Sequence, residues 1–181
     1  MVSINWSIAC VAALGTGLSA SAGVVSGSQS FYNMSGSSRT YTYYQYSPVS
    51  GGSVGTVMNG SITATLTDLN GNGATLSSNP AGNPVYTATI NDVAVQTLWN
   101  SPFSFAVGQF LSGATVPASF ASVPVPAGVP GDGNVGVVLR FTLSAGDAVS
   151  FAYTFNVVPG PGALALLACA GCATNGRRRK S

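Results

Sequence analysis

The chain has 181 residues, of which 46% are hydrophobic and only 6% are charged, and it contains neither histidine nor glutamate. Its net charge is +2, but four of its six cations lie together near the C-terminus, and the rest of the chain keeps only Arg39 and Arg140. So few cations exclude a nucleic-acid-binding domain, and the lack of histidine removes the commonest general base and zinc ligand.

Residues 1–22 are typical of a secretory signal peptide. An apolar stretch over residues 8–18 is followed by Ala20-Ser21-Ala22, whose small side chains suit a cleavage site and predict a mature start near Gly23. The alternative interpretation is that these residues form a first structural helix. Without both ends of the chain, residues 23–157 remain, which is about 135 residues and enough for one domain with a real core.

The middle of the chain alternates between apolar and polar residues with a period of two, which predicts β-strands. We expect strands over residues 40–46, 61–69 and 103–110, and one or two more over 85–98 with a break near Asn91-Asp92. Residues 112–134 lack this period and predict a long loop with a short edge strand near 120–125. Within 61–69 the apolar face is Ile62, Ala64 and Leu66, and the polar face is Thr63, Thr65 and Thr67.

Two long alternating runs close the domain, over residues 135–143 and 149–157. A short turn with Gly146 joins them, so the pattern predicts a β-hairpin whose apolar side chains form the centre of the core. Short strands with frequent turns predict an all-β fold, an antiparallel β-sandwich of the jelly-roll kind, flanked by an N-terminal signal helix and a C-terminal hydrophobic helix. The ten expected core residues are Val135, Val137, Leu139, Phe141, Leu143, Val149, Phe151, Tyr153, Phe155 and Val157.

The C-terminal segment, residues 158–181, has three parts. It opens with Val158, Pro159, Gly160 and Pro161, continues through an apolar run over 163–173, and ends in Arg177, Arg178, Arg179 and Lys180. The prolines prevent a helix from passing, and the cations favour the cytoplasmic side of a membrane. Counted back through the prolines, the run reaches the lower limit of about 17 residues for crossing a bilayer. The alternative is a core helix with a solvated basic end.

This tail resembles the PEP-CTERM sorting signal, a Val-Pro-Glu-Pro-like motif, short transmembrane helix and arginine cluster that exosortases recognise. Gly160 stands where the usual glutamate would be. The resemblance implies an exosortase-like processing enzyme as partner and cutting near Pro159–Pro161. It also implies a membrane stage through residues 158–176, then a place at the cell surface or outside the cell, with attachment to polysaccharide as one outcome.

Two motifs in the domain suggest chemistry that the rest of the chain does not support. Residues 51–55 fit G-x-S-x-G, but no histidine can activate the serine, so we expect a glycine-rich turn. Asp68, Asn70 and Asn72 fit the opening of a calcium loop. With one carboxylate this is a weak calcium candidate, and a plain turn between strands is the preferred interpretation.

Four tyrosines in one predicted strand, Tyr41, Tyr43, Tyr44 and Tyr46, form a candidate stacking platform for sugars. Alternation sends Tyr41 and Tyr43 to one face of the strand and Tyr44 and Tyr46 to the other, so at least one pair should pack against the protein. A second, less favoured candidate is a flat hydroxyl face of the ice-binding type, made from the polar face of 61–69 or from Thr87 and Thr89.

The sequence therefore predicts an exported, non-catalytic surface or extracellular-matrix protein without a cofactor. The first alternative is a secreted carbohydrate-binding module. A glycan hydrolase is less favoured, because it would need two of the four aspartates to converge at about 5–9.5 Å, and nothing in the sequence indicates that they do.

Overall fold

The computed structural model describes residues 23–49, 56–127 and 133–159, and within these ranges it contains eleven β-strands and no helix, so none that could cross a membrane. The predicted signal and hydrophobic helices and the G-x-S-x-G segment lie outside them. The strands are β1 (Gly23–Tyr32), β2 (Arg39–Val49), β3 (Thr56–Asp68), β4 (Ala74–Ser77), β5 (Tyr86–Ile90), β6 (Val93–Leu98), β7 (Ser104–Val107), β8 (Ser112–Ala114), β9 (Ala118–Pro124), β10 (Gly133–Leu143) and β11 (Asp147–Pro159).

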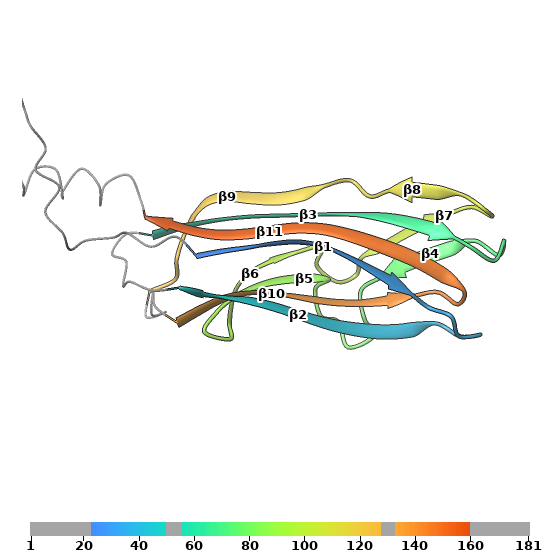
Figure 1. Ribbon diagram of the computed structural model, residues 1–181, viewed down its shortest axis with the longest axis horizontal. Coiled ribbons are helices and arrows are strands. Elements are labelled where there is room, and N and C mark those ends of the chain that lie inside the picture. The colour runs from blue at the N-terminus through green and yellow to red at the C-terminus, as the bar shows by residue number, and fades with distance from the viewer. Residues whose placement is uncertain (1–22, 50–55, 128–132, 160–181) are drawn as a thin grey trace, which may run out of the picture.

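The strands form two antiparallel sheets that run along the long axis of the molecule (Figure 1). Sheet A has the order β1-β11-β3, and both β8 and β9 pair with the far edge of β3. Sheet B has the order β6-β5-β10-β4-β7, and β2 pairs with the other edge of β10. The prediction of an all-β antiparallel fold is confirmed, and the arrangement is consistent with a β-sandwich.

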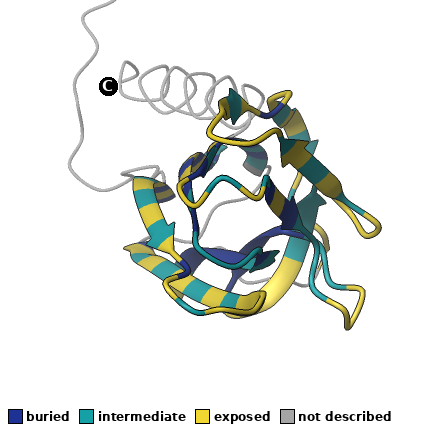
Figure 2. Ribbon diagram, turned by 90° about the vertical axis from the view of Figure 1, so that its right-hand side faces the viewer, coloured by how far each residue is buried: buried dark blue, intermediate teal, exposed yellow. Residues whose placement is uncertain are grey.

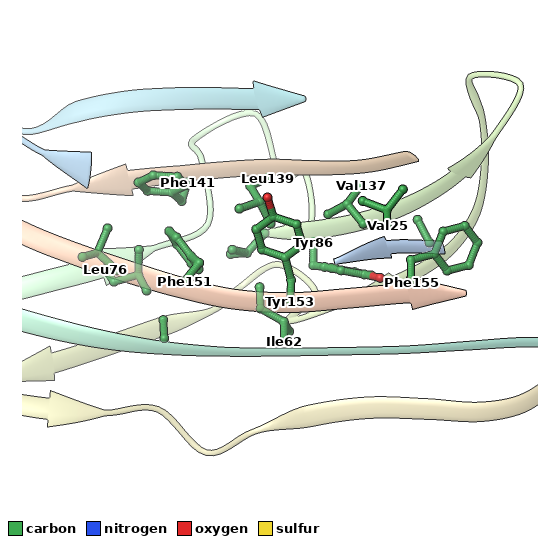
Figure 3. Close-up of a cluster of buried hydrophobic side chains, with 14 of the residues drawn as sticks. Val25, Ile62, Leu76, Tyr86, Val137, Leu139, Phe141, Phe151, Tyr153 and Phe155 are labelled. Carbon is green, nitrogen blue, oxygen red and sulfur yellow. The ribbon is translucent and has the colours of Figure 1, made fainter. Parts of the chain in front are cut away.

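The core lies between the two sheets and is built from the inward-facing positions of their long strands (Figure 3). All ten residues that the sequence predicts as the centre of the core are buried, with Val157 the most exposed at 5%. Tyr86 crosses the core from sheet B, and its hydroxyl donates to the Thr154 carbonyl oxygen in sheet A at 2.8 Å. Strand alternation therefore identifies the core-facing side chains of β3, β10 and β11.

The prediction of a hairpin between the last two strands is wrong. β10 belongs to sheet B and β11 to sheet A, and they face each other across the core instead of pairing. Both strands are already paired on both edges. β10 has β2 on one edge and β5 and β4 on the other, and β11 lies between β1 and β3. The turn after Leu143 thus carries the chain from one sheet to the other.

The sequence does not predict β1, because its inward positions are interrupted by Gly27 and Gln29. Gly27 is needed where it stands, since a Cβ there would lie 2.7 Å from the Tyr153 hydroxyl and 2.8 Å from Gln45 Oε1. The expected long loop over 112–134 also contains more structure than predicted: β8 and β9 run along the edge of β3.

The molecule has two distinct ends. β1 starts with Gly23 opposite Val157, and β11 finishes beside it, so both described chain ends lie at one end, which we call the terminal pole (Figure 1, left). The turns that follow β1, β3, β7 and β10 lie at the opposite end, which we call the loop pole (Figure 1, right). Figure 2 looks onto the loop pole.

Candidate functional site

Tyr41 and Tyr43 point inward and pack against the core. The Tyr41 ring is stacked on Phe141 with centroids 5.3 Å apart and planes 16° apart, and its hydroxyl donates to the Tyr32 carbonyl oxygen at 3.3 Å. Tyr43 lies 6.5 Å from the ring of Tyr153. These two side chains complete the interior between β1 and β2, and neither is offered to a ligand.

Tyr44 and Tyr46 point outward from the same strand and are 52% and 43% exposed. Their ring centroids are 6.3 Å apart and their planes differ by only 15°, so the two rings present nearly parallel faces. Exposed aromatic faces of this kind can take up the apolar face of a sugar ring, while the phenolic hydroxyls hydrogen-bond at its edge.

Beside these rings lie a glycine and two buried threonine side chains. In β10, Tyr46 stands opposite Gly136, where an added Cβ would lie 2.4 Å from Tyr46 Cδ1 and 2.6 Å from Thr89 Oγ1. Thr87 and Thr89 of β5 pair with Val138 and Gly136, so they share the outer face with Tyr44 and Tyr46. Both threonines are 5% exposed, and their Oγ1 atoms have no hydrogen-bond partner.

Charged groups lie at the border of this surface. Partial burial raises the pKa of Tyr46, and a hydrogen bond to the Asp92 carboxylate raises it further, whereas the guanidinium of Arg140 acts in the opposite direction. The phenol therefore stays protonated at neutral pH and keeps its donor. We call Tyr44, Tyr46, Thr87, Thr89 and Asp92 the tyrosine face. Apolar rings with a few orienting polar groups are typical of ligand sites.

The weak calcium candidate has its oxygens in use. Asp68 is 3% exposed, and its carboxylate accepts four backbone N–H groups, from Asn70, Gly71, Gly73 and Phe110, at 2.7–3.2 Å. Asn70 Oδ1 accepts the N–H of Asn72 at 3.1 Å. This geometry favours the turn interpretation, because the carboxylate faces backbone donors instead of a cation. In the described ranges no group of three or more His, Cys, Asp or Glu residues could hold a metal ion.

Two of the four aspartates do converge, although nothing in the sequence indicated it. Asp68 ends β3 directly opposite Asp147, the first residue of β11, and their side chains are close enough for a hydrogen bond. Both are buried, at 3% and 1% exposed. The two carboxylates of a glycan hydrolase must reach the substrate, and these two are buried. Their role in the described structure is to hold the turns of the loop pole together. Strand pairing, which the linear sequence does not reveal, brings these residues together.

The predicted sorting motif begins inside the last strand. Val158 and Pro159 end β11, opposite Val57 and Thr56. Gly160 and Pro161 lie outside the described residues, as do the basic residues Arg177, Arg178, Arg179 and Lys180.

Comparisons with known proteins give no family for this chain. No protein-family model matches it, and no curated protein does. A chain from a structure of infectious bursal disease virus, Gx strain, aligns with a TM-score of 0.26 and 12% sequence identity over 80% of this chain. This protein spans 43% of the length of the viral chain. A likeness at that TM-score carries no argument about fold or function.

Proposed function

We propose that the chain is an exported, non-catalytic protein of the cell surface or extracellular matrix, sorted by a PEP-CTERM-like tail and processed by an exosortase-like enzyme. One observation supports this most directly: Gly23 lies opposite Val157 in the β1–β11 pairing. The predicted signal cleavage site and the predicted sorting motif therefore adjoin the same pole, at the opposite end from the turns that follow β1, β3, β7 and β10.

The position of the core is compatible with processing at both ends. Every buried apolar residue in the described ranges lies between Val25 and Val157. Cleavage before Gly23 and near Pro159–Pro161 would remove none of them. The proposal includes a sandwich of the jelly-roll kind, with a signal helix before it and a hydrophobic helix after it. It places the protein in the inner membrane during transit and outside the cell afterwards.

Mass spectrometry of the protein recovered from its native cells tests the proposal. The expected N-terminus is Gly23, and the expected C-terminus lies between Pro159 and Pro161. Replacing Arg177, Arg178, Arg179 and Lys180 by alanine should leave the tail uncut. A matched pair of changes in the domain, Arg39→Ala and Arg140→Ala, should be processed normally. Surface material that still ends in Ser181 would refute sorting and indicate a permanent anchor.

A second candidate function is carbohydrate binding at the tyrosine face. The observation that favours it is the pair of exposed, nearly parallel Tyr44 and Tyr46 rings. Affinity electrophoresis in gels containing soluble polysaccharides measures such binding. We expect retardation by at least one neutral glycan, and Tyr44→Ala with Tyr46→Ala should weaken it by about tenfold. Tyr32→Ala, which changes an exposed tyrosine elsewhere, should not. Equal mobility of all variants in every gel would refute the idea.

A further inference from the structure

Exposed apolar side chains gather at the loop pole. Five of the ten large hydrophobic residues that are exposed in the described ranges lie on its turns or just beside them. Figure 2, which views this end of the molecule, shows exposed positions along the turns that face the viewer. The loop-pole patch is Tyr32 (60% exposed), Met34 (95%), Leu69 (55%), Phe110 (73%) and Leu111 (58%).

The loops that carry this patch are tied to one another by polar groups beneath it. The Asp68 carboxylate accepts backbone N–H groups from the turn after β3 and from Phe110 in the turn after β7. Asn70 Nδ2 donates to the Ala145 carbonyl oxygen at 2.8 Å. Asn33 Nδ2 donates to the carbonyl oxygens of Leu143 and Ser144 at 3.0 and 2.8 Å. Many of the backbone groups near the patch are therefore already hydrogen-bonded inside the protein.

Phe110 is held outward in an unfavourable backbone conformation. Its φ is 55°, a value that bulky residues rarely adopt, and its N–H donates to Asp68 Oδ2 at 2.7 Å. The ring lies over Gly71, where a Cβ would come within 2.1 Å of Phe110 Cζ, yet the side chain remains 73% exposed. Strain of this kind persists where the surroundings enforce it and is concentrated at functional positions.

The exposed charge at this pole favours an anionic partner. Asp68 and Asp147 are buried beneath the patch, whereas Arg39 is exposed at its border, at the start of β2 opposite Leu143. Asp92 lies in the turn between β5 and β6, and Ile90 just before it pairs with Val135 at the start of β10. The exposed charge at the loop pole is thus positive.

We propose that the loop pole inserts into the headgroup region of a lipid bilayer that contains anionic lipids. Apolar and aromatic side chains beside a cation are the combination that binds bilayer interfaces. Backbone groups that reach the hydrocarbon below the headgroups must be hydrogen-bonded internally, and Asp68, Asn33 and Asn70 already bond several of those beneath the patch. The proposal does not depend on the sorting tail, because the terminal pole is at the other end of the molecule.

A local fluorescence measurement on the full chain tests this, since the apolar segments outside the domain are the same in every variant. Phe110→Trp is compared with Val116→Trp, which replaces an 84% exposed valine between β8 and β9, and the signal of the chain's two native tryptophans is subtracted. Vesicles contain phosphatidylcholine alone or with phosphatidylglycerol, and brominated acyl chains act as the quencher.

We expect Phe110→Trp to shift to the blue and to be quenched several-fold more strongly than Val116→Trp. Quenching should be greater with phosphatidylglycerol, and an added Arg39→Ala should reduce that difference. Equal quenching at both positions, or none at position 110, would overturn the proposal. So would concentration-dependent dimerisation without vesicles that Phe110→Ser with Leu111→Ser abolishes, because the patch would then bind a second copy. Circular dichroism confirms that each variant is folded.

Discussion

Asp68 and Asp147 face each other at the end of the β3–β11 pairing, yet their surroundings treat a negative charge in opposite ways. Burial would raise the pKa of Asp68, but four backbone N–H donors outweigh it and lower the pKa to about 2. Burial raises the pKa of Asp147, and the neighbouring Asp68 raises it further. Hydrogen bonds from Ser144 and the Leu69 backbone lower it, but the net shift is upward. The negative charge therefore belongs to Asp68, and Asp147 carries the proton more readily.

Asp147→Asn should stabilise the protein at neutral pH. An amide at position 147 would face Asp68 with a hydrogen-bond donor instead of a second negative charge. We expect the free energy of unfolding at pH 7 to rise by about 1 kcal/mol, the typical net contribution of one hydrogen bond. Urea denaturation measures it.

The pH dependence gives the control for Asp147→Asn. A raised pKa in the folded state means that the native protein holds the proton more tightly than the unfolded chain. Wild-type stability should therefore fall as pH rises from about 4 through the raised pKa of Asp147. The gap between variant and wild type should open over the same range and nearly close below pH 4. A variant that is less stable than wild type at pH 7 would contradict this account.

Asp68→Asn should destabilise the loop pole. The two carboxylate oxygens of Asp68 accept four backbone N–H groups, whereas an amide has only one acceptor oxygen. The depressed pKa of Asp68 means that its stabilisation is present above about pH 4 and is lost as pH falls toward 2. We expect hydrogen-exchange protection of the Gly71, Gly73 and Phe110 amides, measured relative to the unfolded chain at the same pH, to fall in the variant at pH 7 and in the wild type near pH 2. Unchanged exchange at these amides would show that the carboxylate does not hold the loops.

At the scale of strands, local patterns predict which side chains face inward, but not which strand lies beside which. The turn Asn91-Asp92 was expected to break residues 85–98, and it does, with both residues at positive φ. The alternation after Gly133 is equally compatible with a hairpin or with strands in facing sheets, since both bury the same residues. Only the competition of β1, β2, β3 and β5 for the edges of β10 and β11 decides between them.

The same distinction explains how much of the candidate sites was visible in the sequence. Alternation along one strand separated Tyr44 and Tyr46 from Tyr41 and Tyr43, and the structure places them on opposite faces as expected. The threonine hydroxyls beside Tyr46, by contrast, come from β5 by way of β10. The loop-pole patch and the Asp68–Asp147 contact likewise join residues far apart in the chain, so they follow from topology and not from local pattern.

Tyr86→Phe tests the contact between the two sheets. Tyr86 is fully buried, and its hydroxyl donates from β5 in sheet B to the Thr154 carbonyl oxygen of β11 in sheet A. We expect a loss of about 1–2 kcal/mol in the free energy of unfolding, because the ring still fills its place while a buried hydrogen bond disappears. Tyr44→Phe, at an exposed position, should change it by less than about 0.5 kcal/mol. Equal effects of the two changes would mean that this hydrogen bond does not contribute.

At the scale of the whole molecule, the two poles differ in what they carry. Strand pairing brings both described ends of the chain to the terminal pole, and the turns that carry exposed apolar side chains project from the other. The tyrosine face lies on the outer side of sheet B toward the terminal pole, since Tyr46 pairs with Gly136 near the start of β10. A protein tethered or released at the terminal pole would therefore leave its loop pole free to make contacts.

This division predicts that residues 23–159 fold without the rest of the chain. Every described buried apolar residue lies within that range, and the β1–β11 pairing closes sheet A at its ends. We expect the fragment to unfold cooperatively, with the same thermal midpoint as the full chain in detergent. Residues 33–159, which lack β1, should not unfold cooperatively, because Val25 and Phe31 leave the core and β11 loses its partner over residues 148–157. Circular dichroism and differential scanning calorimetry measure both. A lower midpoint for 23–159 would mean that residues outside it pack against the core, and the two ends of the chain would then belong to the fold instead of to export.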